Sequence, residues 1–116
     1  MKEIEIIHNP RCSKSRQALE ILNKKKVKIN ISLYLSEKMS KKKIKEILKK
    51  LKIKPIELIR KKEKEFKSLR IFDNTHSDER LIEFMLDYPI LIERPIVING
   101  NKAIIARPPE KLLEIL

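Results

Sequence analysis

The feature that most constrains the fold is a hairpin pattern near the end of the chain. Two aliphatic runs at 96–98 and 103–105 flank an Asn-Gly-Asn turn, and Gly100 is the only glycine among 116 residues. Asparagine and glycine tolerate the positive φ that tight hairpin turns need, so the pattern predicts two antiparallel strands. A C-terminal helix is predicted to follow, because prolines at 108 and 109 precede a leucine-rich segment.

The start of the chain carries a β-α-β pattern. An apolar run within 3–7 predicts a short strand, and residues 13–25 show helical periodicity with Ala18 and Leu22 on one face. Residues 27–33 then alternate strictly between aliphatic and polar side chains, which is the period of a half-buried strand. A helix between two strands is the usual connection of a parallel pair, so the pattern predicts a βαβ unit.

Between the two β-containing ends lies a block of helical patterns at about 38–88. Ser40 and Ser77 are predicted N-caps of apolar-periodic helices, and Pro55 is predicted to open a short helix. The chain is therefore predicted to form a single α/β domain, 1–116, with a thioredoxin-like layout. A four-stranded mixed sheet flanked by helices is expected, with the helical insert between the βαβ and ββα halves.

Cys12, the only cysteine, stands where the first strand gives way to the first helix. Unpaired backbone N–H groups and the positive end of the helix dipole favour a thiolate at such a place. Arg11, Lys14 and Arg16 add positive charge nearby. A lone cysteine is most often a small buried hydrophobe, but these polar neighbours predict a partly exposed nucleophile with a low pKa.

The net charge of +12 raises the possibility of a nucleic-acid partner. Residues 38–64 hold 13 basic and 3 acidic residues, and the lysines there alternate with isoleucines at helical spacing. This spacing is typical of a solvated helix face, and an aromatic content of 4% leaves few platforms for stacking bases. Nucleic acid is therefore not the expected partner.

The arginines carry more information than the lysines. Only seven residues are arginine in this lysine-rich chain, and five of them lie near Cys12 or beside turns and prolines. Arginine is needed where a planar fork must bind an anion through two hydrogen bonds, a task for which a lysine point charge does not serve. The distribution indicates recognition of an oxyanion.

Targeting and redox signals predict a cytoplasmic protein. No apolar run approaches the ~18 residues of a membrane span, and the N-terminus has no secretory apolar region, so no membrane partner is expected. A single cysteine excludes an internal disulfide and fits a reducing compartment. No metal and no bound cofactor are expected.

Four segments together resemble the glutaredoxin-coupled arsenate reductases, and in particular the short members of that family. They are His-Asn-Pro-Arg-Cys-Ser-Lys-Ser-Arg at 8–16, the region from Phe-Met to Pro-Ile-Leu at 84–91, Glu-Arg-Pro-Ile-Val at 93–97 and Arg-Pro-Pro-Glu at 107–110. The resemblance covers essentially the whole chain in order.

The resemblance implies that Cys12 attacks arsenate, that glutathione displaces the thiol–arsenate adduct, and that glutaredoxin completes reduction to arsenite. It implies glutathione as co-substrate, and the protein is expected to be a monomer. It assigns oxyanion binding to three arginines, Arg60, Arg94 and Arg107. It also places two further residues, His8 and Ser15, close to the thiol.

The physical chemistry of these residues agrees with the resemblance. Three guanidinium forks can orient a tetrahedral oxyanion and hold the pKa of a nearby thiol low. Because the chain has no second cysteine, an outside thiol is required to resolve an intermediate. The Arg94–Pro95 peptide is predicted to be cis, since thioredoxin-like folds place a cis-proline at the start of the third strand, facing the thiol.

Three other classes of protein need residues that this chain lacks. A tyrosine-phosphatase loop needs an arginine at position 18, where this chain has Ala18, and a dithiol oxidoreductase needs a second cysteine at position 15, where it has Ser15. A non-enzymatic thioredoxin-fold regulator that binds RNA polymerase typically carries a Cys-x-x-Cys switch, which is missing. Action on another oxyanion or on a protein thiol stays open.

Overall fold

The computed structural model describes residues 3–116, which divide into a sheet unit and a helical unit. The sheet unit comprises the residues up to Glu37 together with Arg94–Leu116, and the helical unit is Lys38–Glu93. That the two units form one folding domain stays a prediction.

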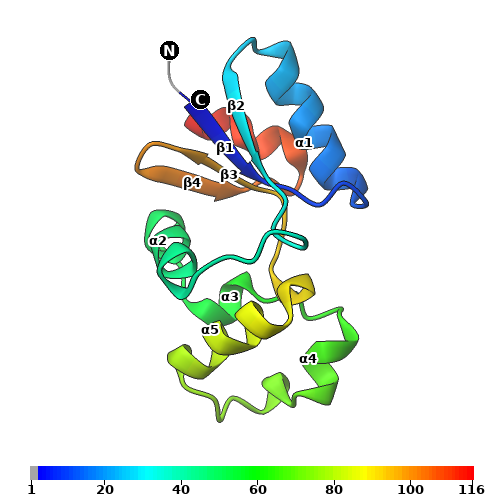
Figure 1. The fold of residues 1–116 in the computed structure, drawn as a ribbon, viewed down its shortest axis with the longest axis vertical. Coiled ribbons are helices and arrows are strands. Elements are labelled where there is room, and N and C mark those ends of the chain that lie inside the picture. Colours follow the sequence, from blue (N-terminus) through cyan, green and yellow to red (C-terminus); the bar gives the residue numbers. More distant parts are fainter. Residues whose placement is uncertain (1–2) are drawn as a thin grey trace. The chain divides into compact units, whose positions relative to one another are not determined.

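The sheet unit contains four strands, one α-helix and a C-terminal 3-10 helix. In chain order these are β1 (Glu3–Ile7), α1 (Ser13–Lys24), β2 (Lys28–Ser32), β3 (Ile96–Asn99), β4 (Lys102–Ile105) and η3 (Pro109–Ile115). The strand order is β2-β1-β3-β4, with β1 and β2 parallel and the other two pairs antiparallel (Figure 1). This arrangement confirms the predicted four-stranded mixed sheet.

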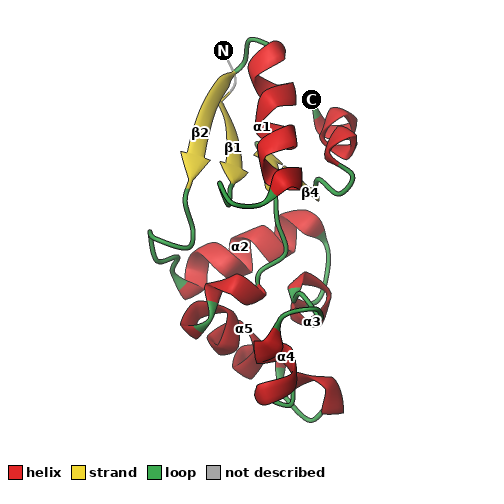
Figure 2. Ribbon diagram, turned by 90° about the vertical axis from the view of Figure 1, so that its right-hand side faces the viewer, coloured by secondary structure: helices red, strands yellow, loops and turns green. Residues whose placement is uncertain are grey.

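The core of the sheet unit lies between the sheet and two helical segments, α1 and η3. Alternate residues of β1 and β3 point to this side, because successive side chains of a strand face opposite ways. They pack against the buried faces of α1 and η3, which lie side by side (Figure 2). The buried cluster consists of Ile4, Ile6, Ala18, Leu22, Val97, Ala106 and Leu112. Burial of each large aliphatic member contributes about 1.5–3 kcal/mol, which fixes α1 and the start of η3 against the sheet.

The hairpin between β3 and β4 is the one that the sequence predicts. Its last paired residues are Asn99 and Lys102, and Gly100 has a φ of 63° in the turn. A side chain at this φ would be strained, which accounts for the glycine. The Asn99 side chain donates a hydrogen bond of 2.7 Å to the carbonyl of Ile115, so the turn also holds the end of η3.

The helical unit contains six short elements: α2 (Lys41–Leu51), α3 (Pro55–Leu58), α4 (Lys64–Ser68), η1 (Ile71–Asp73), α5 (Asp78–Asp87) and η2 (Pro89–Leu91). Both predicted N-caps are confirmed. The Ser40 hydroxyl accepts a hydrogen bond of 3.0 Å from the Lys43 N–H, and that of Ser77 accepts one of 3.1 Å from the Arg80 N–H. A cap of this kind stabilises a helix by about 1 kcal/mol.

The basic segment forms the solvated helix face that its spacing indicates. Ile44, Ile47 and Leu48 of α2 are buried, whereas Lys42 and Lys45 are exposed. No helix within residues 3–116 combines the length and the apolar character needed to cross a membrane.

Candidate active site

Cys12 occupies the N-cap position of α1, directly after the loop that leaves β1. Its backbone is extended (φ −94°, ψ 122°), its N–H donates to the carbonyl of Asn9 at 3.0 Å, and its own carbonyl accepts from the Arg16 N–H at 3.0 Å. The thiol is free and partly exposed. The predicted position at a helix N-terminus is therefore confirmed.

The pKa of the Cys12 thiol is lowered from its ordinary value. Burial is the largest single effect and raises the pKa, but four groups together outweigh it. The backbone N–H groups of Ser15 and Lys14 donate to the sulfur, and the side chains of Arg107 and Arg94 add hydrogen bonds from positive charge. Because the helix terminus and the two guanidinium groups all favour the anion, the thiolate forms at a lower pH than that of an ordinary cysteine.

The hairpin brings Arg94 and Arg107 to this thiol. Arg94 directly precedes the Pro95 that leads into β3, and Arg107 follows β4. One terminal nitrogen of Arg107 lies 3.8 Å from the Cys12 sulfur and also donates to the Arg94 carbonyl at 3.0 Å. Arg94 is itself buried. The Arg94–Pro95 peptide is cis, as predicted, and the Arg107–Pro108 peptide is also cis, which the sequence analysis did not predict.

His8 and Ser15 form a buried pair beneath the loop. His8 Nδ1 and Ser15 Oγ lie 2.6 Å apart, and the same Ser15 oxygen accepts the Asn9 N–H at 3.0 Å. Burial, followed by the positive charge of Arg16, lowers the pKa of His8. His8 is consequently neutral near pH 7, and its pairing with Ser15 links the end of β1 to the first turn of α1. This link positions the segment that carries Cys12.

Arg60 belongs to the helical unit. It forms ion pairs with Glu93, at 2.9 Å, and with Glu63, at 3.6 Å, and its N–H donates to the Leu91 carbonyl at 2.7 Å. No pattern in the sequence predicts either glutamate as a partner of Arg60, although Glu93 belongs to the segment at 93–97. The assignment of Arg60 to the oxyanion site stays a prediction.

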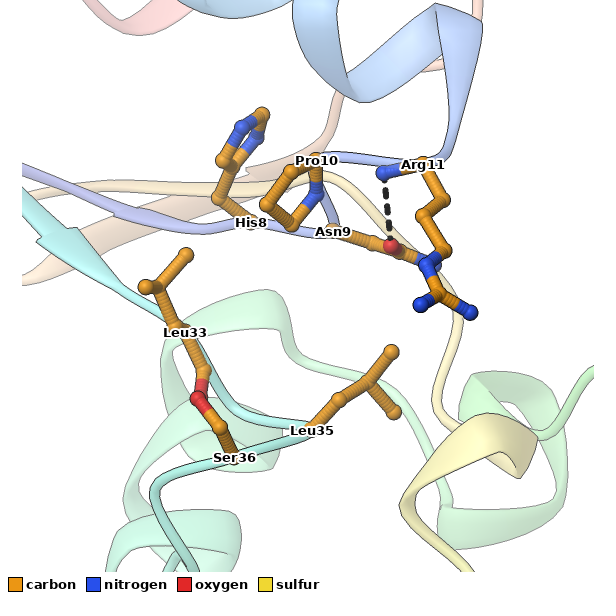
Figure 3. Close-up of a pocket in the computed structure, with 7 residues that line it drawn as sticks. All are labelled: His8, Asn9, Pro10, Arg11, Leu33, Leu35 and Ser36. Atoms are coloured by element: carbon orange, nitrogen blue, oxygen red, sulfur yellow. Dashed lines mark hydrogen bonds between the residues drawn. The ribbon is translucent and has the colours of Figure 1, made fainter.

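A pocket of about 360 Å³ opens beside the Cys12 loop (Figure 3). One wall is formed by the loop between β1 and α1 and the other by the segment after β2. The lining residues are His8, Asn9, Pro10, Arg11, Leu33, Leu35 and Ser36. Among residues 3–116 no group of three or more His, Cys, Asp or Glu side chains is arranged to hold a metal ion.

The lowered pKa of Cys12 gives a direct prediction for alkylation. The rate of reaction with iodoacetamide should follow the thiolate and reach half its maximum at a pH clearly below the free-thiol value of about 8.5. The rate should fall as the pH drops through the pKa of the folded protein. Measured in urea, the same chain should titrate near the free value. A folded-state midpoint at or above 8.5 would show that the thiol is not activated.

The fold and the site together define a thioredoxin-like protein with a single activated thiol beside two arginines. Residues 7–115 match the sequence model of the ArsC family, and the chain belongs to that family.

Relatives match over nearly the full length of this chain. It is 45% identical over 112 residues to an arsenate reductase of Haemophilus influenzae, covering 96% of this chain and 97% of that protein. It is 44% identical over 116 residues to the uncharacterized protein YfgD of Escherichia coli K12, covering 99% of this chain and 98% of that protein. The solved structure of an arsenate reductase from Vibrio cholerae has a TM-score of 0.95 at 37% identity, covering 99% of this chain and 98% of that one.

Proposed function

We propose that this protein is a cytoplasmic arsenate reductase that uses glutathione and glutaredoxin as reductants. The observation that carries the proposal is the contact between the Arg107 guanidinium and the Cys12 sulfur, at 3.8 Å, with Arg107 also held by the Arg94 carbonyl. An anion drawn to this guanidinium meets the nucleophile directly. The arsenate reductases among its relatives support arsenate as that anion.

The chemistry needs one thiol more than the chain provides. Reduction of one arsenate by two thiols yields arsenite, one disulfide and one water. The Cys12 thiolate supplies the first sulfur by attacking arsenic, and an oxygen leaves as water. With no second cysteine in the sequence, the second sulfur must come from outside. In our proposal glutathione attacks the Cys12 sulfur of the adduct, which releases arsenite and leaves a Cys12–glutathione mixed disulfide. Glutaredoxin then reduces this disulfide and returns Cys12 to its thiol form.

A coupled assay tests the proposal. The purified protein is mixed with arsenate, glutathione, glutaredoxin and glutathione reductase, and consumption of NADPH is followed. We expect consumption that depends on arsenate and stops when glutaredoxin is omitted. Phosphate in place of arsenate is the control, because it has the same shape and charge but is not reduced by thiols. Absence of arsenate-dependent consumption at any glutaredoxin concentration would refute the proposal.

Replacement of Arg60 tests whether this residue belongs to the oxyanion site. If Arg60 binds the oxyanion, Arg60→Ala should lower kcat/KM for arsenate by about tenfold or more, as loss of a charge-assisted hydrogen bond does. Glu93→Gln removes a partner of Arg60 but leaves the guanidinium in place, so it separates loss of the ion pair from loss of the anion ligand. Near-full activity in Arg60→Ala would place Arg60 outside the site.

A further inference from the structure

The pocket beside the Cys12 loop has one charged wall and one apolar wall. Arg11 supplies the charge, and Figure 3 shows its side chain extending toward Leu35 on the opposite wall. Leu35 is 41% exposed, and Leu33 lies next to it in the lining. None of the described residues that line the pocket carries a carboxylate, and the lowered pKa of His8 leaves that residue neutral. Arg11 is thus the only charge in the lining.

The Arg11 guanidinium is available to a ligand. The Arg11 backbone N–H donates to the Asn9 side-chain oxygen at 3.0 Å, which fixes the residue at its backbone. Within residues 3–116 its guanidinium has no hydrogen-bond or ion-pair partner, in contrast to that of Arg16, which donates to the Pro10 carbonyl at 2.9 Å. An exposed guanidinium above an apolar surface fits a ligand with a carboxylate and a short apolar stem.

The pocket and the nucleophile share one loop. Arg11 directly precedes Cys12, and the Asn9 that lines the pocket accepts the Cys12 N–H. A ligand held in the pocket therefore contacts the same loop that carries the thiol. The chain has no cysteine of its own to react with the Cys12 sulfur, so the group that must be delivered is an external sulfur.

We propose that this pocket binds the external thiol co-substrate, a peptide-sized thiol whose carboxylate pairs with Arg11 and whose stem lies on Leu33 and Leu35. The pocket volume of about 360 Å³ is within the range of small-molecule sites. The identity of the thiol as glutathione rests on the proposed function, but the site itself does not. Arg94 and Arg107 serve the oxyanion, and Arg11 serves the thiol.

A disulfide exchange reaction tests the thiol site without arsenate, so its result does not depend on arsenate reduction. The Cys12 thiolate attacks oxidised glutathione, forming a Cys12–glutathione mixed disulfide and releasing one glutathione thiolate. The same attack on 2-hydroxyethyl disulfide forms a mixed disulfide without any carboxylate. Mass spectrometry gives both rates, each corrected for the measured thiolate fraction of the variant.

Three variants decide the proposal. Arg11→Gln should slow exchange with oxidised glutathione about tenfold or more and leave exchange with 2-hydroxyethyl disulfide unchanged. Arg11→Lys should retain part of the preference, because it keeps the charge but not the fork. Lys25→Gln, at the far end of α1, removes the same charge and should change neither rate.

Two results would overturn the proposal. One is an equal loss of rate with both disulfides in Arg11→Gln, which would show that Arg11 positions Cys12 and does not bind the carboxylate. The other is an unchanged preference for oxidised glutathione. If the coupled arsenate assay fails but the exchange rates of the three variants are as expected, only the proposed function is refuted. In the coupled assay, a raised KM for glutathione and an unchanged KM for arsenate in Arg11→Gln would support both the thiol site and the proposed function.

Discussion

Replacing Cys12 with serine is expected to abolish arsenate-dependent turnover, with a fall in kcat/KM of about 10³-fold or more. The same N–H groups and guanidinium side chains that lower the pKa of the thiol cannot ionise a serine hydroxyl near neutral pH. The coupled assay measures the loss. Since serine is close in size to cysteine and the site is partly exposed, thermal unfolding should change little, which confirms that the variant is folded. Retention of a tenth of the activity would rule out Cys12 as the nucleophile.

Substitution of Arg107 is expected to have the second largest effect. Arg107→Ala removes both the contact with the Cys12 sulfur and the hydrogen bond to the Arg94 carbonyl. We expect kcat/KM for arsenate to fall about 10²- to 10³-fold, as when one donor to a developing anion is lost. The alkylation midpoint of Cys12 should also move to higher pH, because a group that stabilises the thiolate is gone.

Two further variants make the Arg107 result specific. Arg107→Lys keeps the charge but loses the planar fork, so its activity should stay well below that of the unchanged protein. Arg70→Lys is the matched control, since the Arg70 side chain is 72% exposed in the helical unit, and its activity should be unchanged. If Arg107→Lys is fully active, charge alone suffices and the fork geometry plays no part.

Features that depend on local sequence could be predicted. The alternation of β2, the hairpin at Gly100 and the caps at Ser40 and Ser77 all act within a few residues. The helices α4 and η1 were not predicted, because segments of five and three residues are too short to show an apolar period. The C-terminal helix is present but is a 3-10 helix, beginning with a bond from the Lys111 N–H to the Pro108 carbonyl.

In the candidate site, too, contacts between residues close in sequence could be predicted, whereas contacts that depend on the tertiary fold could not. Cys12, His8 and Ser15 lie within one short stretch, so their proximity follows from a single strand-to-helix connection. The bond from Arg107 to the Arg94 carbonyl depends on how the hairpin closes, which no local pattern contains. The apolar wall of the pocket was also missed. It exists only because β2 lies beside β1 in parallel register, which brings the segment after β2 next to the Cys12 loop.

The contact between Cys12 and Arg107 joins residues that are 95 positions apart. Synthesis proceeds from the N-terminus, so the thiol leaves the ribosome well before its guanidinium partner. A nascent chain therefore carries a cysteine without its arginine contacts. The backbone N–H groups of Ser15 and Lys14 come from the same short stretch as the thiol, so the arginine contacts are the part of this environment that depends on the distant hairpin. The full set of groups that favour the thiolate is therefore assembled only when the hairpin has docked.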